Sequence, residues 1–213
     1  MSAYAGDVAA LARKDLLLEL RSRDTLPAML LFVVSALTIF HFALPSGSSE
    51  RAETGLLWIA IVFTALLGLT RAFAAEREQG LLDGLVLAPC DRSAIWLGKT
   101  IGVTLFLVLA EIVALPAFAL FFHPLSWELV AAVALADIGI AAIGTLLAAI
   151  AAASRARELM LPLMFLPLAI PVVIGGVGAS IAANPGTFLA FLGLYDGVFA
   201  ILSWASFEYV ITE

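Results

Sequence analysis

The sequence has little charge and a single cysteine. Charged residues make up 13% of its 213 residues, whereas 63% are hydrophobic and the mean hydropathy is +1.09. Soluble domains carry about 25% charged residues, so this chain could not cover a surface exposed to water. Cys90 alone can form neither an internal disulfide nor a cysteine metal cluster. The composition therefore predicts an integral membrane protein.

Enzyme and metal motifs are also scarce. The Gly-rich loop of ATP-binding proteins is missing, so we expect this chain not to bind ATP itself. Gly178 and Ser180 match half of a serine nucleophile motif, but Ala182 stands where that motif ends in glycine. His41 and His123 are interpreted as polar anchors near the membrane surface, with metal or haem ligation as the alternative. We expect no catalytic residue and no metal site.

Six long apolar segments predict an all-α polytopic protein with one transmembrane domain over residues 1–213. A helix needs about 20 apolar residues to cross the hydrocarbon core. The expected spans cover about 25–44, 54–75, 94–122, 127–152, 159–182 and 188–211, the third being interrupted at Pro116. We expect no cleaved signal peptide, because more than twenty residues precede the first span. Little length remains for an ATPase domain, which would have to be a separate chain.

Basic residues gather on one side of these spans. With a cytoplasmic N-terminus, ten bases lie inside and only Arg51 lies outside. The ten are Arg13, Lys14, Arg21, Arg23, Arg71, Arg77, Arg92, Lys99, Arg155 and Arg157. Because lysine and arginine are enriched in cytoplasmic loops, both termini are predicted to be cytoplasmic.

Residues 4–23 predict an amphipathic helix before the first span. Its apolar face holds Val8, Ala12, Leu16 and Leu20 at four-residue spacing. Its bases are Arg13, Lys14, Arg21 and Arg23. This pattern favours an interfacial helix whose bases contact anionic lipid headgroups, over a plain cytosolic helix.

The fifth span contains helix breakers. Its prolines are Pro162, Pro167 and Pro171, and its glycines are Gly175, Gly176 and Gly178. Each proline removes a backbone donor and disturbs the preceding turn. We expect a bent or broken segment that re-enters from the outer face, with a kinked spanning helix as the alternative.

Three acidic residues lie inside the spans. Glu111, Asp137 and Asp196 are each roughly 12–17 Å below the outer surface at ~1.5 Å per residue. An ionised carboxylate at that depth costs about 2.5 kcal/mol or more. They form either hydrogen bonds within the bundle or a polar belt at a subunit or partner interface that moves during the ATP cycle.

Residues 76–93 join the second and third spans and contain the piece LLDGLVL, which is too short to cross a membrane. Helix-breaking residues stand on both sides of this piece. The residues alone are compatible with an ordinary loop and with a short, rigid docking helix. The pattern from Glu76 to Lys99, E-x-x-x-G-L-L-D-G-L-x-x-x-P followed by G-K, resembles the inner loop of type-2 ABC exporter permeases. That loop is a coupling helix in the class.

The whole chain resembles the CcmB family, the haem exporter permease of cytochrome c maturation. The resemblance rests on the length, the loop just described, DLLLELRSRD at 15–24 and LPLMFLPLAIP at 161–171. It implies a non-enzymatic subunit of the bacterial inner membrane, with a coupling helix that docks an ATPase. The docking residues would be Glu76, Glu78, Gly80, Asp83, Gly84 and Pro89.

The resemblance also implies partners. They are the ATPase CcmA, which binds the ATP, a second copy of the chain, CcmC and CcmD, and indirectly the haem chaperone CcmE. Membrane lipid surrounds the complex, the complex handles haem, and nucleic acid is not a partner. Two alternatives stay open from the residues: a type-2 permease that exports a lipid, glycan or drug, and an ATP-independent channel or membrane enzyme.

Overall fold

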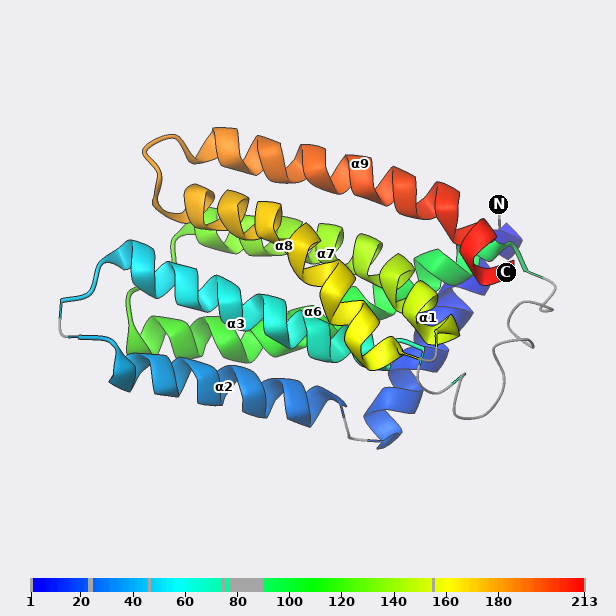
Figure 1. Ribbon diagram of the computed structural model, residues 1–213, viewed down its shortest axis with the longest axis horizontal. Coiled ribbons are helices and arrows are strands. Elements are labelled where there is room, and N and C mark those ends of the chain that lie inside the picture. Colours follow the sequence, from blue (N-terminus) through cyan, green and yellow to red (C-terminus); the bar gives the residue numbers. More distant parts are fainter. Residues whose placement is uncertain are drawn as a thin grey trace.

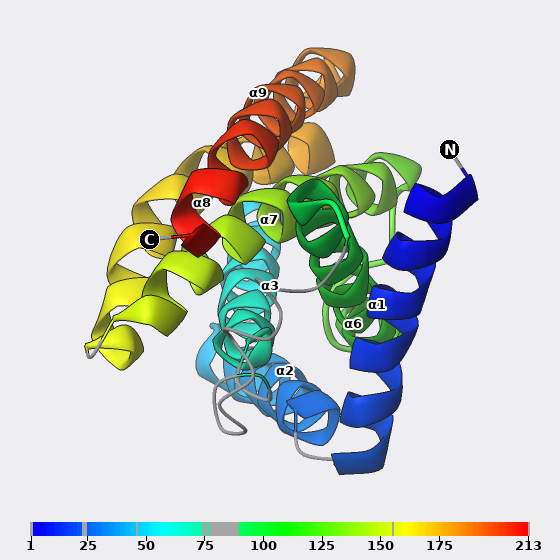
Figure 2. The same ribbon diagram turned by 90° about the vertical axis from the view of Figure 1, so that its right-hand side faces the viewer.

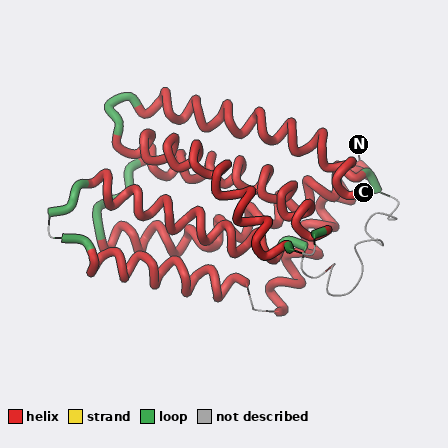
Figure 3. Tube along the Cα trace, in the orientation of Figure 1, coloured by secondary structure: helices red, strands yellow, loops and turns green. Residues whose placement is uncertain are grey.

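The computed structural model describes residues 2–22, 25–45, 47–73, 76, 90–154 and 156–212. Within these residues the chain forms seven helices and no strand (Figures 1 and 3). They are α1 (Ser2–Ser22), α2 (Thr25–Ala43), α3 (Glu50–Arg71), α6 (Arg92–Phe121), α7 (Trp127–Ala153), α8 (Arg157–Ile181) and α9 (Pro185–Thr212). All but α1 are long and apolar enough to cross a membrane. The predicted all-α polytopic fold is confirmed.

The six long helices run side by side as a bundle, with α7 the most buried of them (Figures 1 and 2). Helix α7 packs against α9, α8, α6 and α3. Its buried side chains are largely alanine, among them Ala132, Ala136 and Ala141. Small residues let membrane helices approach closely, so the composition of α7 suits the centre of the bundle.

Side-chain caps fix where several spans begin. The Ser49 hydroxyl accepts a hydrogen bond from the backbone N–H of Ala52, which starts α3 at Glu50 rather than at residue 54. The Asp91 carboxylate accepts one from Ser93 N–H at 2.8 Å and starts α6. The polar first turn of α3 therefore belongs to the helix and not to the preceding loop.

Helix α8 runs unbroken through its three prolines, so the predicted break and re-entry are wrong, and the alternative, a kinked helix long enough to span the membrane, agrees with the structure. Figure 1 shows α8 changing direction along its length while it still crosses the whole bundle. The Tyr195 hydroxyl of α9 donates to the Leu168 carbonyl of α8 at 2.6 Å and so joins these two helices near the prolines. Pro116 likewise lies within a continuous α6 and does not interrupt it.

The glycines of α8 create close contacts instead of a break. A Cβ at Gly176 would overlap the indole ring of Trp58 on α3, and one at Gly178 would overlap the ring of Phe188. At Gly175 it would lie 2.8 Å from Leu192 Cδ2. The glycines thus let large side chains from α3 and α9 pack directly on the α8 backbone.

Helix α1 lies across one end of the bundle, roughly perpendicular to the spans (Figures 1 and 2). It packs mainly against α6, burying Val8 and Ala12 of its predicted apolar face. Gly98 of α6 permits this contact, because a Cβ there would lie only 2.8 Å from Leu11 Cβ. The crosswise placement is the one that an interfacial helix needs.

Candidate functional site at the basic end of the bundle

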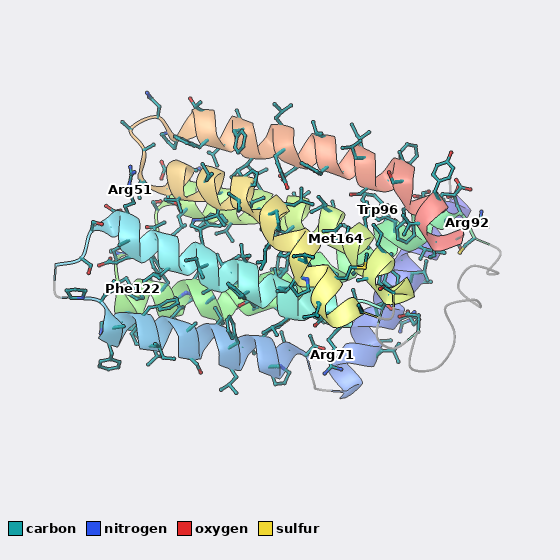
Figure 4. All side chains as sticks on the ribbon, viewed as in Figure 1. Arg51, Arg71, Arg92, Trp96, Phe122 and Met164 are labelled. Carbon is teal, nitrogen blue, oxygen red and sulfur yellow. The ribbon has the colours of Figure 1, made fainter. Side chains whose placement is uncertain are left out.

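Both chain termini lie at the same end of the bundle as α1 (Figure 1). Arg71 and Arg92 lie at this end and Arg51 lies at the opposite end (Figure 4). We call these the basic end and the far end. At the basic end, residue 76 marks the start of the predicted docking segment.

An ion-pair cluster joins three parts of the chain at the basic end. It consists of Lys14 and Asp15 of α1, Glu76, and Lys99 of α6. Lys99 Nζ lies 2.7 Å from Glu76 Oε1 and 3.1 Å from Asp15 Oδ2. Lys14 Nζ lies 3.0 Å from Asp15 Oδ1 and also pairs with Glu76 Oε1. Two cations and two anions make the cluster neutral.

Lys99 has further contacts that hold its ammonium group in place. It donates to the carbonyl of Ala72 at 2.7 Å, and it lies 4.9 Å from the centre of the Phe73 ring. These two residues follow directly after α3. The side chain of Lys99 is 4% exposed and that of Glu76 is 5% exposed. A buried charge needs such partners, because removing one partner leaves the other uncompensated.

The electrostatics of Glu76 reflect this environment. Burial alone would raise the pKa of its carboxyl group, but the nearby charge of Lys99 and the hydrogen bonds from Lys14 and Lys99 outweigh burial. The pKa of Glu76 is therefore held below its ordinary value of 4.5. For Lys14, burial opposes the charged form, and Glu76 and Asp15 together raise the pKa above 10.5. Both groups remain charged at neutral pH.

The cluster links separate elements of the fold. The cluster ties α1, the end of α3 and α6 to residue 76. Beside it lies a cavity of about 50 Å³, lined by Arg71, Glu76 and Lys99 among others. That volume has room for ordered water.

A family model described as CcmB protein matches residues 7–207, from α1 almost to the end of α9. The chain belongs to the CcmB family. The matched residues include all four members of the ion-pair cluster. The resemblance noted in the sequence is thus confirmed.

Curated relatives carry the name heme exporter protein B. The protein of Rhodobacter capsulatus is 31% identical over 172 residues, covering 78% of this chain and 79% of the relative. That of Paracoccus denitrificans is 31% identical over 192 residues, covering 86% and 88%. That of Pseudomonas aeruginosa is 29% identical over 184 residues, covering 83% and 81%. Together with the six apolar helices, these matches make the chain a multi-pass bacterial membrane protein.

Two residues of this CcmB-family chain have partners that differ from those predicted. Glu76 was expected to contact an ATPase, but its side chain is buried and paired with Lys14 and Lys99. Lys14 was expected to contact lipid headgroups, but it pairs with Asp15 and Glu76. Arg13 is exposed, as a headgroup contact requires. The cause is that α1 packs on α6, which brings one basic side chain of α1 inward.

Other predicted site residues cannot be placed. Those outside the described residues are Arg23, Glu78, Gly80, Asp83, Gly84 and Pro89, and the side chain of Arg21 is not described either.

Two members of the cluster, Asp15 and Lys99, were not predicted as site residues. A signal was available, because Lys99 stands inside an otherwise apolar stretch of α6. A charged side chain in such a position calls for a partner.

The structure brings two of the three membrane-embedded acids together. Glu111 of α6 and Asp137 of α7 line the same groove between these helices. Asp196 of α9 packs instead against Gly139, where a Cβ would overlap its carboxyl group. Residues 137 and 139 face different directions on α7, since successive helical residues are about 100° apart. The acids share a depth in the bundle but do not form one belt.

The two histidines lie among aromatic rings at the far end. His41 stacks on Phe121 with ring centres 5.3 Å apart. His123 meets Phe118 edge-on at 4.8 Å, and its Nε2 lies 3.3 Å from Thr54 Oγ1. Within the part of the chain that the structure describes, no three metal-ligating side chains gather.

Proposed function

We propose that this chain is the membrane subunit of a haem exporter ABC transporter that acts in cytochrome c maturation. The observation that carries the proposal is the family match over residues 7–207, with relatives named heme exporter protein B. Six apolar helices suit a permease. The chain has no ATP-binding motif, so ATP is bound and hydrolysed by a separate subunit, CcmA.

The ion-pair cluster supports a route for coupling. CcmA docks on the segment 76–91, and its movement is passed from residue 76 to α1 and α6 through Lys14 and Lys99. A buried network with several short contacts suits this role because it resists deformation. Glu76 begins this segment, and its side chain is a positioning group that faces Lys14 and Lys99 and not CcmA.

Assembly and orientation complete the proposal. Two copies of the chain join CcmC and CcmD, and the complex delivers haem to the chaperone CcmE. The chain lies in the bacterial inner membrane with the basic end and both termini in the cytoplasm. The excess of basic residues that the sequence predicts on one side of the spans, ten against one, supports this orientation.

Gene deletion tests the function. The strain lacking this gene should lose covalently bound haem from its c-type cytochromes, measured by haem staining of membrane proteins. The wild-type gene on a plasmid should restore it. Normal haem staining in the deletion strain would show that this chain is not needed for cytochrome c maturation and would overturn the proposal.

Co-purification tests the docking segment. Gly84→Trp should release CcmA from the purified complex while the permease stays in the membrane, because a bulky side chain blocks the contact surface. Gly186→Trp is the matched control: Gly186 is exposed at the far end with no atom within 4 Å of a Cβ. Undiminished co-purification after combined substitution of Gly80, Gly84 and Pro89 would exclude segment 76–91 as the docking site.

A further inference from the structure

A groove of about 430 Å³ lies between α6 and α7. Its lining residues recur at helical spacing on both helices, for example Glu111, Ile112 and Pro116 on α6, and Ala134 and Asp137 on α7. The groove thus follows the two helix surfaces for about two turns, which is the shape that accepts the ridge of another helix. Most of the lining is apolar, and the two carboxyl groups are the exception.

The carboxyl groups lack donors. Asp137 is 1% exposed and Glu111 is 8% exposed. No donor from the described residues reaches either oxygen of Asp137 or Oε1 of Glu111. Both residues line the groove, so these three oxygens lie buried beside it without a donor.

A backbone carbonyl adds to this shortage of donors. Pro116 has no N–H, so it cannot donate to the carbonyl of Ile112 one turn earlier. Both residues line the same groove as the carboxyl groups. The groove therefore offers several hydrogen-bond acceptors and calls for a donor from outside the chain.

Lipid cannot supply that donor at this depth. Glu111 and Asp137 are each ten residues from the far ends of their helices, about 15 Å at the helical rise of 1.5 Å per residue. This is the middle of a hydrocarbon core that is about 30 Å thick. Acyl chains cover apolar side chains well but leave carboxyl oxygens unpaired. An occupant with a donor group is needed.

A second copy of this chain cannot supply a cation at that depth either. The bases in the described spans lie near helix ends, and Lys99, the base furthest inside a span, is already paired with Glu76 and Asp15. Pairing two such grooves would bring carboxyl groups against each other. The complementary group must come from a different protein.

We propose that the groove between α6 and α7 binds a transmembrane helix of another protein that carries a lysine or arginine near the middle of its span. The cation pairs with Glu111 and Asp137. The apolar stripe of the same helix packs along the groove toward the far end, over Ala134 and Leu125. The two acids thereby select for the partner, because a purely apolar helix gains nothing from them.

A model peptide tests this inference in lipid vesicles that contain the purified full-length chain. The probe is a fluorescently labelled leucine-rich transmembrane peptide with one central arginine, and the control peptide has leucine there. Energy transfer from a label on the chain measures association. We expect the arginine peptide to bind about ten-fold more tightly, as buried polar contacts between membrane helices allow. The preference should vanish in the double variant Glu111→Gln and Asp137→Asn.

Two further variants distinguish the groove from general effects. Asp196→Asn removes a buried acid that does not line the groove and should keep the ten-fold preference. Ala134→Phe fills the groove from an exposed position and keeps both acids, so it should weaken peptide binding even if the double variant fails to fold. Equal association of the two peptides with the wild-type chain would overturn the proposal.

A small ligand is the competing outcome. Tetraphenylphosphonium binding that disappears in the double variant, without any preference for the arginine peptide, would assign the groove to a lipophilic cation. The helix proposal would then be wrong. Neither result depends on haem, CcmA or cytochrome c maturation, so this test is independent of the proposed transport function.

Discussion

The ammonium group of Lys99 lies 2.7 Å from Oε1 of Glu76, although the two residues are 23 positions apart. The same carboxylate oxygen pairs with Lys14, which lies 62 positions away in α1. One oxygen atom thus connects the crosswise helix, the segment after α3 and the third span. Substitutions at this contact therefore test how strongly the cluster stabilises the basic end of the bundle.

Glu76→Gln should detach α1 from the bundle. It leaves the buried Lys99 with Asp15 as its remaining carboxylate partner among the described residues, and removing one partner of a buried ion pair costs about 3–5 kcal/mol. The measurements are the unfolding midpoint in detergent and amide hydrogen exchange of α1, which should speed up. Glu208→Gln is the control, because the pair of Glu208 with Arg92 is exposed and such pairs contribute about 0–1 kcal/mol. Equal effects of both variants would contradict the structural role of the cluster.

Acid should loosen the same contact. Because the folded pKa of Glu76 is held below 4.5, its ionised form stabilises the folded state above that pH. The stabilisation is lost as pH falls below 4.5 through the folded pKa. We expect a spin label at Ala10 of α1 to become more mobile in that window. In Glu76→Gln the acid transition should disappear, and a transition that persists there would implicate another carboxyl group.

Gly98→Ala should move α1 away from α6. Alanine is a better helix former than glycine by about 1 kcal/mol, so propensity alone predicts stabilisation. The added Cβ, however, would lie 2.8 Å from Leu11 Cβ and 3.3 Å from the Val8 carbonyl oxygen. Gly102→Ala is the control on the same helix, since its Cβ would make only an ordinary 3.7 Å contact with Asp15. A gain in stability for Gly98→Ala equal to that of Gly102→Ala would refute the close approach.

Gly176→Ala should destabilise the bundle near the far half of α8. Its Cβ would overlap the fully buried indole of Trp58, and overpacking of this kind costs about 1–3 kcal/mol. Thermal unfolding and the fluorescence of Trp58 report the change. Gly197→Ala on α9 is matched to it, because no atom lies within 4 Å of a Cβ there. An unchanged unfolding midpoint for Gly176→Ala would mean that α3 and α8 can separate at no cost.

The prolines of α8 and the acids of the spans show where prediction from the sequence stopped. Pro162, Pro167 and Pro171 predict disturbed backbone wherever they occur. Whether the helix breaks depends on its neighbours, here Trp58 and Phe188, whose rings pack on the α8 backbone at Gly176 and Gly178. Depth along a span can be counted from the sequence. The direction in which Asp137 and Asp196 face, relative to other helices, cannot be read from the sequence.

The sequence by itself determined the six spans, the amphipathic helix before them, their orientation bias and the family. Each of these follows from hydropathy, charge or a motif within one continuous stretch of chain, because membrane insertion depends on such local properties. Only the tertiary structure decided that Glu76 turns inward to Lys99 and Lys14, and that Glu111 and Asp137 line one groove while Asp196 does not. Those pairings depend on which helices become neighbours. That choice is made by packing, for example by Gly98 under α1 and Gly176 under Trp58, between residues far apart in the chain.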